Sequence, residues 1–187
     1  MASDLRPSEF LKQIWTLDGY YVLGIKIGQT WRWITAKPED ADEVVEKYRS
    51  ADIYYGVNPR AENPNGKKGS DLDIEQANVL FADFDFKEKK DCSPGVYKDE
   101  PNGELELCYE EDGKTFYVRR PPLSSLFEKV VERVPPPSFV VDSGNGYHFI
   151  WLLDRPYEIE DWKKLERWLV EEKLKDLGAD PQVKDPS

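Results

Sequence analysis

The sequence predicts one domain of mixed α/β or α+β class. Segments with the apolar pattern of buried strands alternate along the chain with segments whose apolar residues recur at helical spacing. Hydrophobic residues make up 39% and aromatic residues 13% of the 187 residues, which is enough for a packed interior. No apolar run is long enough to span a membrane, and the charged N-terminus is unlike a secretory signal. We therefore expect a cytoplasmic protein with no membrane partner.

The first part of the chain is expected to form helices around a hairpin. The helical spacing of apolar residues, and a proline suited to a first turn, predict helices at residues 3–17 and 38–49. Runs of apolar and β-branched residues predict strands at residues 20–27, 30–35 and 53–57. Gly28-Gln29 is a suitable turn between the first two strands. A loop rich in Asn, Pro, Gly and Lys follows at residues 58–73.

The second part is expected to be organised around one buried strand, residues 79–86. A polar insertion follows at residues 87–122, which we expect to lie outside the main sheet with a hairpin of its own. The remaining predicted elements are a helix at 123–134, strands at 139–142 and 147–153 joined by a glycine turn, and a helix at 158–177 that Gly178 ends.

Charge and cysteine content exclude some classes of protein. The net charge of −11 argues against a surface coated for nonspecific nucleic-acid binding, although it is compatible with a local basic groove. Short basic clusters such as Arg119-Arg120 are interpreted as solvated surface. Cys92 and Cys108 cannot form a four-ligand zinc site by themselves, so no zinc is expected. The sequence leaves open whether they are free thiols or form one disulfide.

Two aspartates interrupt the central strand. Asp83 and Asp85 are two positions apart, so on a strand both side chains point to the same face. Neighbouring carboxylates among apolar residues resist ionisation, and a divalent cation bound to both removes this conflict. The pair predicts a site that holds Mg²⁺ or Mn²⁺ against a triphosphate. The alternative is a strand end where both acids meet water.

The segment from Ser143 to His148 predicts contacts to phosphate. Gly144 and Gly146 allow backbone amides to approach oxygen anions closely. Ser143 offers a hydroxyl, and His148, the only histidine, can donate a hydrogen bond to a phosphate. The alternative is a tight hairpin with a satisfied histidine in the core.

Asp180 is the candidate for a third metal ligand. It lies just past the expected helix end at Gly178 and before a proline, where an acid can be held rigidly. Three carboxylates are the usual protein contribution to a two-metal site, with phosphate and water supplying the rest. Asp185 competes for this role, and Asp142 is a weaker competitor.

The order of these motifs resembles the archaeo-eukaryotic primase superfamily, and in particular the primase–polymerase catalytic domains of plasmids, viruses and mobile elements. The likeness rests on Asp83-x-Asp85, Ser143-Gly-x-Gly-x-His148 and Ala179-Asp180. The segments from Tyr55 to Arg60 and from Gly178 to Pro186 also resemble that group.

The resemblance implies a two-part fold with an RNA-recognition-motif-like sheet and flanking helices. It implies template-directed nucleotidyl transfer by a DNA primase–polymerase with two Mg²⁺ or Mn²⁺ ions. Asp83, Asp85 and Asp180 would be the catalytic metal ligands. Contacts to the incoming nucleotide would come from Ser143, Gly144, Gly146, His148 and Arg60.

The implied partners are a DNA template and primer, nucleoside triphosphates, and a replicative helicase that is either fused or separate. The sequence departs from the family in two ways. Its two cysteines cannot make the zinc element of many relatives, and it stops before an arginine-containing segment. We therefore expect a domain shortened at its C-terminus.

Two other classes remain as hypotheses. A non-catalytic nucleic-acid-binding module would use its aromatic residues to stack bases, and its acids would be incidental. A rolling-circle-type nickase fits less well, because such enzymes usually pair histidines on their metal and this chain has one.

Overall fold

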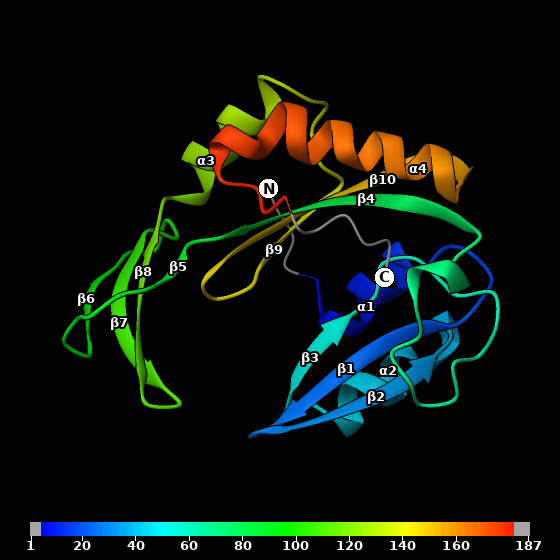
Figure 1. The fold of residues 1–187 in the computed structure, drawn as a ribbon, viewed down its shortest axis with the longest axis horizontal. Helices are drawn as coiled ribbons and strands as arrows, with labels where there is room; N and C mark the ends of the chain where they lie inside the picture. Colours follow the sequence, from blue (N-terminus) through cyan, green and yellow to red (C-terminus); the bar gives the residue numbers. More distant parts are fainter. Residues whose placement is uncertain (1–4, 182–187) are drawn as a thin grey trace. The chain divides into compact units, whose positions relative to one another are not determined.

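The computed structural model describes residues 5–181 and divides them into two compact units. The first unit contains residues 5–79 and 152–164, and the second contains residues 80–151 and 165–181. Three elements pass from one unit to the other (Figure 1), namely β4 (Gln76–Asp85), β10 (Gly146–Glu158) and α4 (Ile159–Arg167). In this part of the chain no helix is long and apolar enough to cross a membrane.

The first unit contains a three-stranded antiparallel sheet in the order β2-β1-β3. Its strands are β1 (Tyr21–Ile27), β2 (Thr30–Ala36) and β3 (Asp52–Tyr55). The predicted hairpin is confirmed, and Gly28 adopts a positive φ of 58° in its two-residue turn. The two predicted helices correspond to α1 (Pro7–Ile14) and to a 3₁₀ turn (Pro38–Asp40) followed by α2 (Ala41–Lys47).

Aromatic and aliphatic side chains form the core of the first unit on one face of this sheet. Tyr21, Leu23 and Ile25 alternate along β1 and are fully buried. The Trp15 ring, just after α1, stacks on Tyr21 with centroids 4.7 Å apart, and its Nε1 donates to the Gly56 carbonyl. Because these residues occupy one face of the strand, the opposite face of the sheet carries a different set of side chains.

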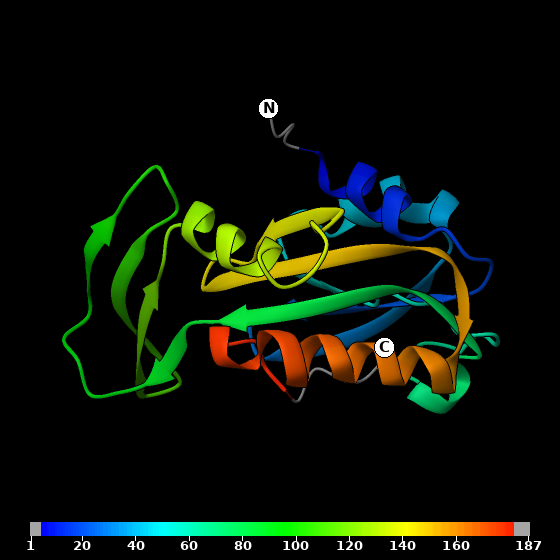
Figure 2. The same ribbon diagram turned by 90° about the horizontal axis from the view of Figure 1, so that it is seen from above.

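The second unit contains the central strand and its neighbours in the sheet β4-β10-β9, where β9 is Phe139–Asp142. The helix α3 (Leu123–Val131) and residues 165–177 lie over the same face of this sheet (Figures 1 and 2). Phe84 and Phe149 are fully buried on that side, with ring centroids 5.2 Å apart.

The predicted long helix is divided into three segments. After α4 the chain continues as a π-helical stretch and a 3₁₀ turn, at Trp168–Leu174 and Lys175–Leu177. Gly178 then ends the helix in the left-handed conformation, with φ of 99°, as predicted.

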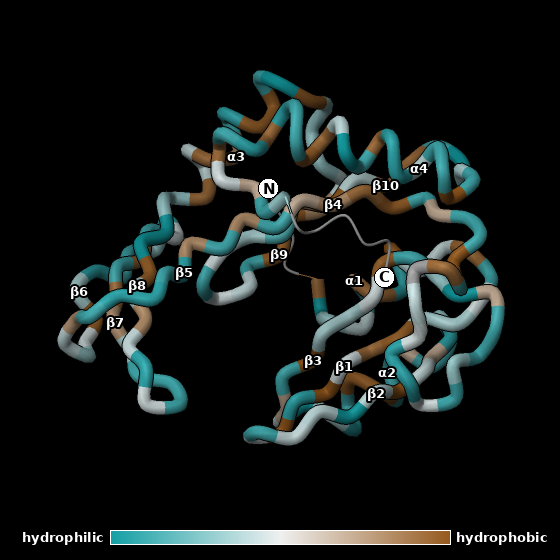
Figure 3. The backbone as a smooth tube through the Cα atoms, in the orientation of Figure 1, coloured by the Kyte–Doolittle hydropathy of each residue, from teal (hydrophilic) through white to brown (hydrophobic). Residues whose placement is uncertain are grey.

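The insertion after the central strand forms a four-stranded sheet of its own in the order β5-β8-β7-β6. The strands are β5 (Lys87–Lys89), β6 (Gly95–Asp99), β7 (Leu105–Glu111) and β8 (Lys114–Arg120). Figure 3 shows that the β6–β7 region is mostly hydrophilic, in contrast to much of β10. Asp112 and Gly113 both have positive φ, the conformation that a two-residue hairpin turn requires. Cys92 and Cys108 form a disulfide, which resolves the alternative left open by the sequence.

Candidate metal and nucleotide site

Asp83 and Asp85 lie near the end of β4 on the face opposite the core of the second unit. Ala82 and Phe84, which alternate with them, are completely buried. The Asp83 side chain is 30% exposed and Asp85 is exposed. Since side chains alternate along a strand, the two carboxylates share a face, as the spacing predicted.

The charges around Asp83 come from the residues that the sequence singled out. Burial raises the pKa of the Asp83 carboxyl above its ordinary value, and the nearby Asp85 and Asp180 carboxylates raise it further. His148 acts in the opposite direction, with its Nε2 3.7 Å from Asp83 Oδ1. The structure thus brings Asp83, Asp85, Asp180 and His148 into one electrostatic cluster within the second unit.

Asp180 is positioned by the backbone. Its N–H donates to the carbonyl oxygen of Asp83 at 2.8 Å, which holds the chain after Gly178 against β4. Ala179 is buried and its N–H donates to the Leu174 carbonyl at 3.3 Å. The competitor Asp185 lies outside the described residues.

The loop from Ser143 to Gly146 joins β9 to β10 and is held by its own hydrogen bonds. The Ser143 N–H donates to the Gly146 carbonyl at 3.0 Å. The Gly144 N–H donates to Asp142 Oδ1 at 2.8 Å. Both amides therefore already have acceptors within the β9–β10 hairpin, whereas the Ser143 side chain is exposed. Binding of phosphate by the loop amides stays a prediction.

Gly146 has a packing role that the sequence did not reveal. A Cβ on this residue would lie 1.9 Å from the Phe84 carbonyl oxygen, so only glycine lets β10 pass this close to β4. Two residues later, His148 is partly exposed, while Tyr147 and Phe149 are buried on the other face. Alternation of side chains along β10 thus places His148 on one face and these two rings on the other.

Arg120 corrects the interpretation of the Arg119-Arg120 cluster as solvated surface. Arg119 is exposed, but Arg120 is only 7% exposed. Its guanidinium donates to Asp142 Oδ1, to the Gly144 carbonyl at 2.8 Å and to the Gly103 carbonyl at 2.9 Å. Asp142 is thus engaged by Arg120 and by the loop, which weakens it as a metal ligand. No local pattern in the sequence marks Arg120 as buried.

A buried acid behind the central strand was also missed. Glu166 on α4 is completely buried, and its Oε2 accepts a hydrogen bond from the Phe81 N–H at 3.3 Å. Burial raises the pKa of this carboxyl well above its ordinary value. Glu166 satisfies a backbone donor on the outer edge of β4, two residues before Asp83.

Arg60 belongs to the first unit, unlike the other candidates. It is 1% exposed, and its backbone pairs with Tyr20 through two hydrogen bonds of 2.9 Å. The neighbouring Asn58 is also buried, and its side chain bonds the backbone of Asn78 and Val79 at the start of β4. The segment from Tyr55 to Arg60 therefore has a clear structural purpose, and contact of Arg60 with a phosphate stays a prediction.

The donor set at Asp83 suits a hard divalent cation. Carboxylate oxygens are the ligands that Mg²⁺ and Mn²⁺ prefer. A bound cation would favour the charged form of Asp83, whose pKa is raised by burial and, to a smaller extent, by the neighbouring carboxylates. Within residues 5–181, no three His, Cys, Asp or Glu side chains are already arranged to hold a metal. Asp85 Oδ1 accepts a hydrogen bond from the Lys87 N–H at 2.9 Å, which leaves its other carboxylate oxygen to bind an ion.

Comparisons with known proteins agree with the predicted fold. No family model matches the sequence. A replication protein from Clostridium perfringens is 26% identical over 158 residues, which cover 83% of this chain and 30% of that protein. The chain therefore spans less than a third of the length of this curated relative.

Among solved structures, the AEP domain of the cyanophage S-2L primase–polymerase (PrimPol) matches with a TM-score of 0.56 and 14% identity. The match covers 97% of this chain and 77% of that one. The chain thus has the fold of a primase–polymerase AEP domain, as the resemblance of its motifs predicted.

Proposed function

We propose that this chain, with its primase–polymerase fold, is the nucleotidyl-transfer domain of a DNA primase–polymerase. The observation that supports this most strongly is the cluster of Asp83, Asp85, Asp180 and His148 in the second unit. These residues come from three separate segments of the chain, and they are the residues that the motif order singled out. The similarity to a replication protein is consistent with the same role.

The proposed reaction joins a nucleotide to a primer strand. The 3′-hydroxyl of a primer, or of a first nucleotide, attacks the α-phosphate of a nucleoside triphosphate. A phosphodiester bond forms and pyrophosphate leaves. Asp83, Asp85 and Asp180 would hold two Mg²⁺ or Mn²⁺ ions, which supply neutralising charge and lower the pKa of the attacking hydroxyl.

The remaining residues of the site bind and orient the triphosphate. The exposed hydroxyl of Ser143 and the imidazole of His148 donate to phosphate oxygens. His148 is held beside Asp83, so a phosphate bound to it is brought to the acidic cluster. Arg120 positions the loop through Gly144 and Asp142 rather than by touching the nucleotide. Positioning and charge neutralisation are the main contributions in phosphoryl transfer.

A primer-extension assay with Mg²⁺ or Mn²⁺ tests the proposal. Asp83→Asn, Asp85→Asn and Asp180→Asn should each lower the incorporation rate about a hundredfold or more, the usual effect of removing an electrostatic group from an active site. Asp91→Asn, an exposed aspartate in the insertion, serves as the control and should extend the primer at the parental rate. Extension by Asp83→Asn at the parental rate would show that the cluster is not catalytic.

A non-catalytic nucleic-acid-binding module is the second candidate. It is favoured by exposed aromatic side chains in the first unit, Trp31 and Tyr54. Such a module needs no triphosphate, so metal-dependent binding of a nucleoside triphosphate to the purified chain would decide in favour of the enzyme.

A further inference from the structure

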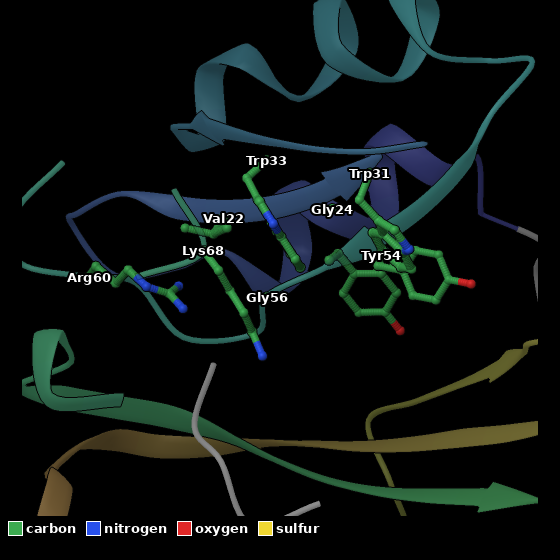
Figure 4. Close-up of a pocket in the computed structure, with 9 residues that line it drawn as sticks. Val22, Gly24, Trp31, Trp33, Tyr54, Gly56, Arg60 and Lys68 are labelled. Atoms are coloured by element: carbon green, nitrogen blue, oxygen red, sulfur yellow. The ribbon is translucent and has the colours of Figure 1, made fainter. Parts of the chain in front are cut away.

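The face of the β2-β1-β3 sheet opposite the core of the first unit carries a group of aromatic side chains. Trp33, Gly24 and Tyr54 are directly paired across the three strands, so they share a face. Trp31 lies two residues before Trp33 and points the same way. We call Trp31, Trp33 and Tyr54 the aromatic face; Figure 4 shows these rings side by side over the sheet.

The rings of the aromatic face form a continuous platform. Trp31 and Trp33 are nearly parallel, with centroids 5.7 Å apart and an interplanar angle of 18°. The Tyr54 ring lies beside Trp31, with centroids 4.7 Å apart, and is tilted by 47° from its plane. Gly24 makes room for them, because a Cβ there would lie 2.8 Å from the Trp33 ring and 3.1 Å from the Trp31 ring. Because Gly24 has no side chain, the two tryptophan rings can lie close to the backbone of β1, the middle strand.

This platform is accessible. Trp31 is 46% exposed and Tyr54 is 49% exposed, although such large rings are usually well covered in a folded protein. Together with Lys68, Arg60 and Gly24, the rings line a pocket of about 220 Å³. That volume is below the roughly 300–1,000 Å³ of typical small-molecule sites, so the pocket suits a flat group laid on the rings better than an enclosed ligand.

Positive charge borders the aromatic face in a chain whose net charge is −11. Lys68 is exposed, and its Nζ lies 6.0 Å from the centre of the Trp33 ring. Arg60 lines the same end of the pocket (Figure 4). Lys26 is paired with Trp31 in the strand register. Aromatic rings next to basic side chains favour a ligand with flat aromatic groups on an anionic backbone.

We propose that the aromatic face binds single-stranded DNA by stacking its bases on Trp31, Trp33 and Tyr54. Lys68 contacts the adjoining phosphates. The choice of DNA rests on the proposed function, whereas the stacking itself rests on the geometry of the first unit. Stacking on ring faces is tolerant of sequence, so the site has no strong base preference. It requires neither metal nor nucleoside triphosphate.

Fluorescence anisotropy with a labelled oligothymidylate, in EDTA and without nucleotide, tests this proposal. Trp31→Ala and Tyr54→Ala should each weaken binding about fivefold or more, as loss of a base-stacking ring does. Trp31→Phe keeps a ring and should recover most of the loss. Thermal melting of each variant checks that the sheet is intact, and because Tyr54 is half exposed, Tyr54→Ala remains informative if Trp31→Ala is poorly folded.

Two exposed aromatic residues elsewhere in the chain are matched controls. Trp168 is 37% exposed and also has a lysine over its ring, with Lys173 Nζ at 5.4 Å. Tyr97 in the insertion is 53% exposed. Trp168→Ala and Tyr97→Ala should bind the oligonucleotide like the parent chain. If they weaken binding as much as Trp31→Ala and Tyr54→Ala do, binding is not specific to the aromatic face.

Salt dependence separates the stacking contribution from the ionic one. Lys68→Gln should make the affinity less sensitive to salt, because one phosphate contact is lost. Trp31→Ala should weaken binding at every salt concentration and leave the sensitivity unchanged.

Three results would overturn the inference: no binding of single-stranded DNA, binding unaffected by Trp31→Ala and Tyr54→Ala, or binding of RNA at the aromatic face without binding of DNA. Failure of the DNA-binding inference can be distinguished from failure of the proposed function, because the anisotropy assay contains no metal. If these variants bind normally while Asp83→Asn loses primer extension, the enzyme proposal stands alone. If Asp83→Asn extends primers normally, that proposal fails whatever the anisotropy shows.

Discussion

At the scale of single residues, the pKa of Asp83 is raised both by burial and by repulsion from neighbouring carboxylates. An acid whose pKa is raised by folding favours the folded state only while it is protonated. Its contribution is therefore present below its ordinary pKa and is lost as the pH rises through the folded pKa. At neutral pH without metal, the raised pKa of Asp83 should make the folded chain less stable than a neutral residue at this position would.

We expect Asp83→Asn to raise the melting temperature at neutral pH in EDTA, with a gain that shrinks as the pH falls toward 4. Divalent metal with a nucleoside triphosphate should stabilise the parent chain but not this variant. Differential scanning calorimetry across pH gives both measurements, with Asp91→Asn as the control. A pH-independent gain would mean that the charge of Asp83 is not what costs stability.

His148 is held beside Asp83 on the partly exposed face of β10. If it donates to a phosphate, His148→Ala should remove about 1.5–3 kcal/mol of binding free energy, roughly ten- to over a hundredfold in triphosphate affinity. His148→Gln keeps a donor and should lose less. Isothermal titration with a nucleoside triphosphate and Mn²⁺ measures both. An unchanged affinity in His148→Ala would reduce this residue to a packing role.

At the scale of elements, the approach of β10 to β4 depends on Gly146. Gly146→Ala should lower the free energy of unfolding by about 1–3 kcal/mol, because the added Cβ meets the rigid backbone of Phe84. Gly95 on β6 is the control, since a Cβ there meets nothing within 4 Å. Gly95→Ala should stay within about 0.5 kcal/mol of the parent. Equal effects in urea unfolding would contradict the assigned contact.

The loop between β9 and β10 depends on Arg120 from β8. Arg120→Ala removes charge-assisted hydrogen bonds to Asp142, Gly144 and Gly103, and should cost about 1.5–3 kcal/mol of stability. It should also raise the KM for nucleotide more than it lowers kcat, because Arg120 positions the loop and does not itself touch the nucleotide. Arg119→Ala, one residue away and exposed, should change neither quantity. A purely structural Arg120 would leave KM unchanged at temperatures where the variant is folded.

At the scale of the whole molecule, the sequence predicted the order of the main elements. Periodicity located the hairpin of β1 and β2, the central strand and α3, because each has a strong apolar pattern bounded by turn residues. The short polar strands β5 and β6 were not predicted. They are defined by their pairing with neighbouring strands, and their amino-acid composition does not mark them as strands. The division of the last helix into α-helical, π-helical and 3₁₀ segments also has no signal in the apolar pattern.

The candidate site, like the fold, was predictable from the sequence only in part. Asp83 and Asp85 followed from strand alternation, and Asp180 from its place after a helix end. Arg120 and Glu166 were not predictable, because a buried charge is recognised only by the partners that surround it. The packing role of Gly146 depends on a contact with Phe84, which is 62 residues earlier in the chain and invisible to local patterns. That the insertion at 87–122 is peripheral stays a prediction.

The most direct test of the proposed function is a crystal of this chain soaked with Mn²⁺ and a nucleoside triphosphate. Anomalous diffraction should locate manganese between the carboxylates of Asp83 and Asp85, with Asp180 completing the protein ligands. Ser143 and His148 should lie against the phosphates. Carboxylates and a triphosphate repel one another, so they converge only when divalent cations lie between them. Triphosphate bound without manganese at Asp83, or neither bound at millimolar concentrations, would contradict the proposed nucleotidyl transfer.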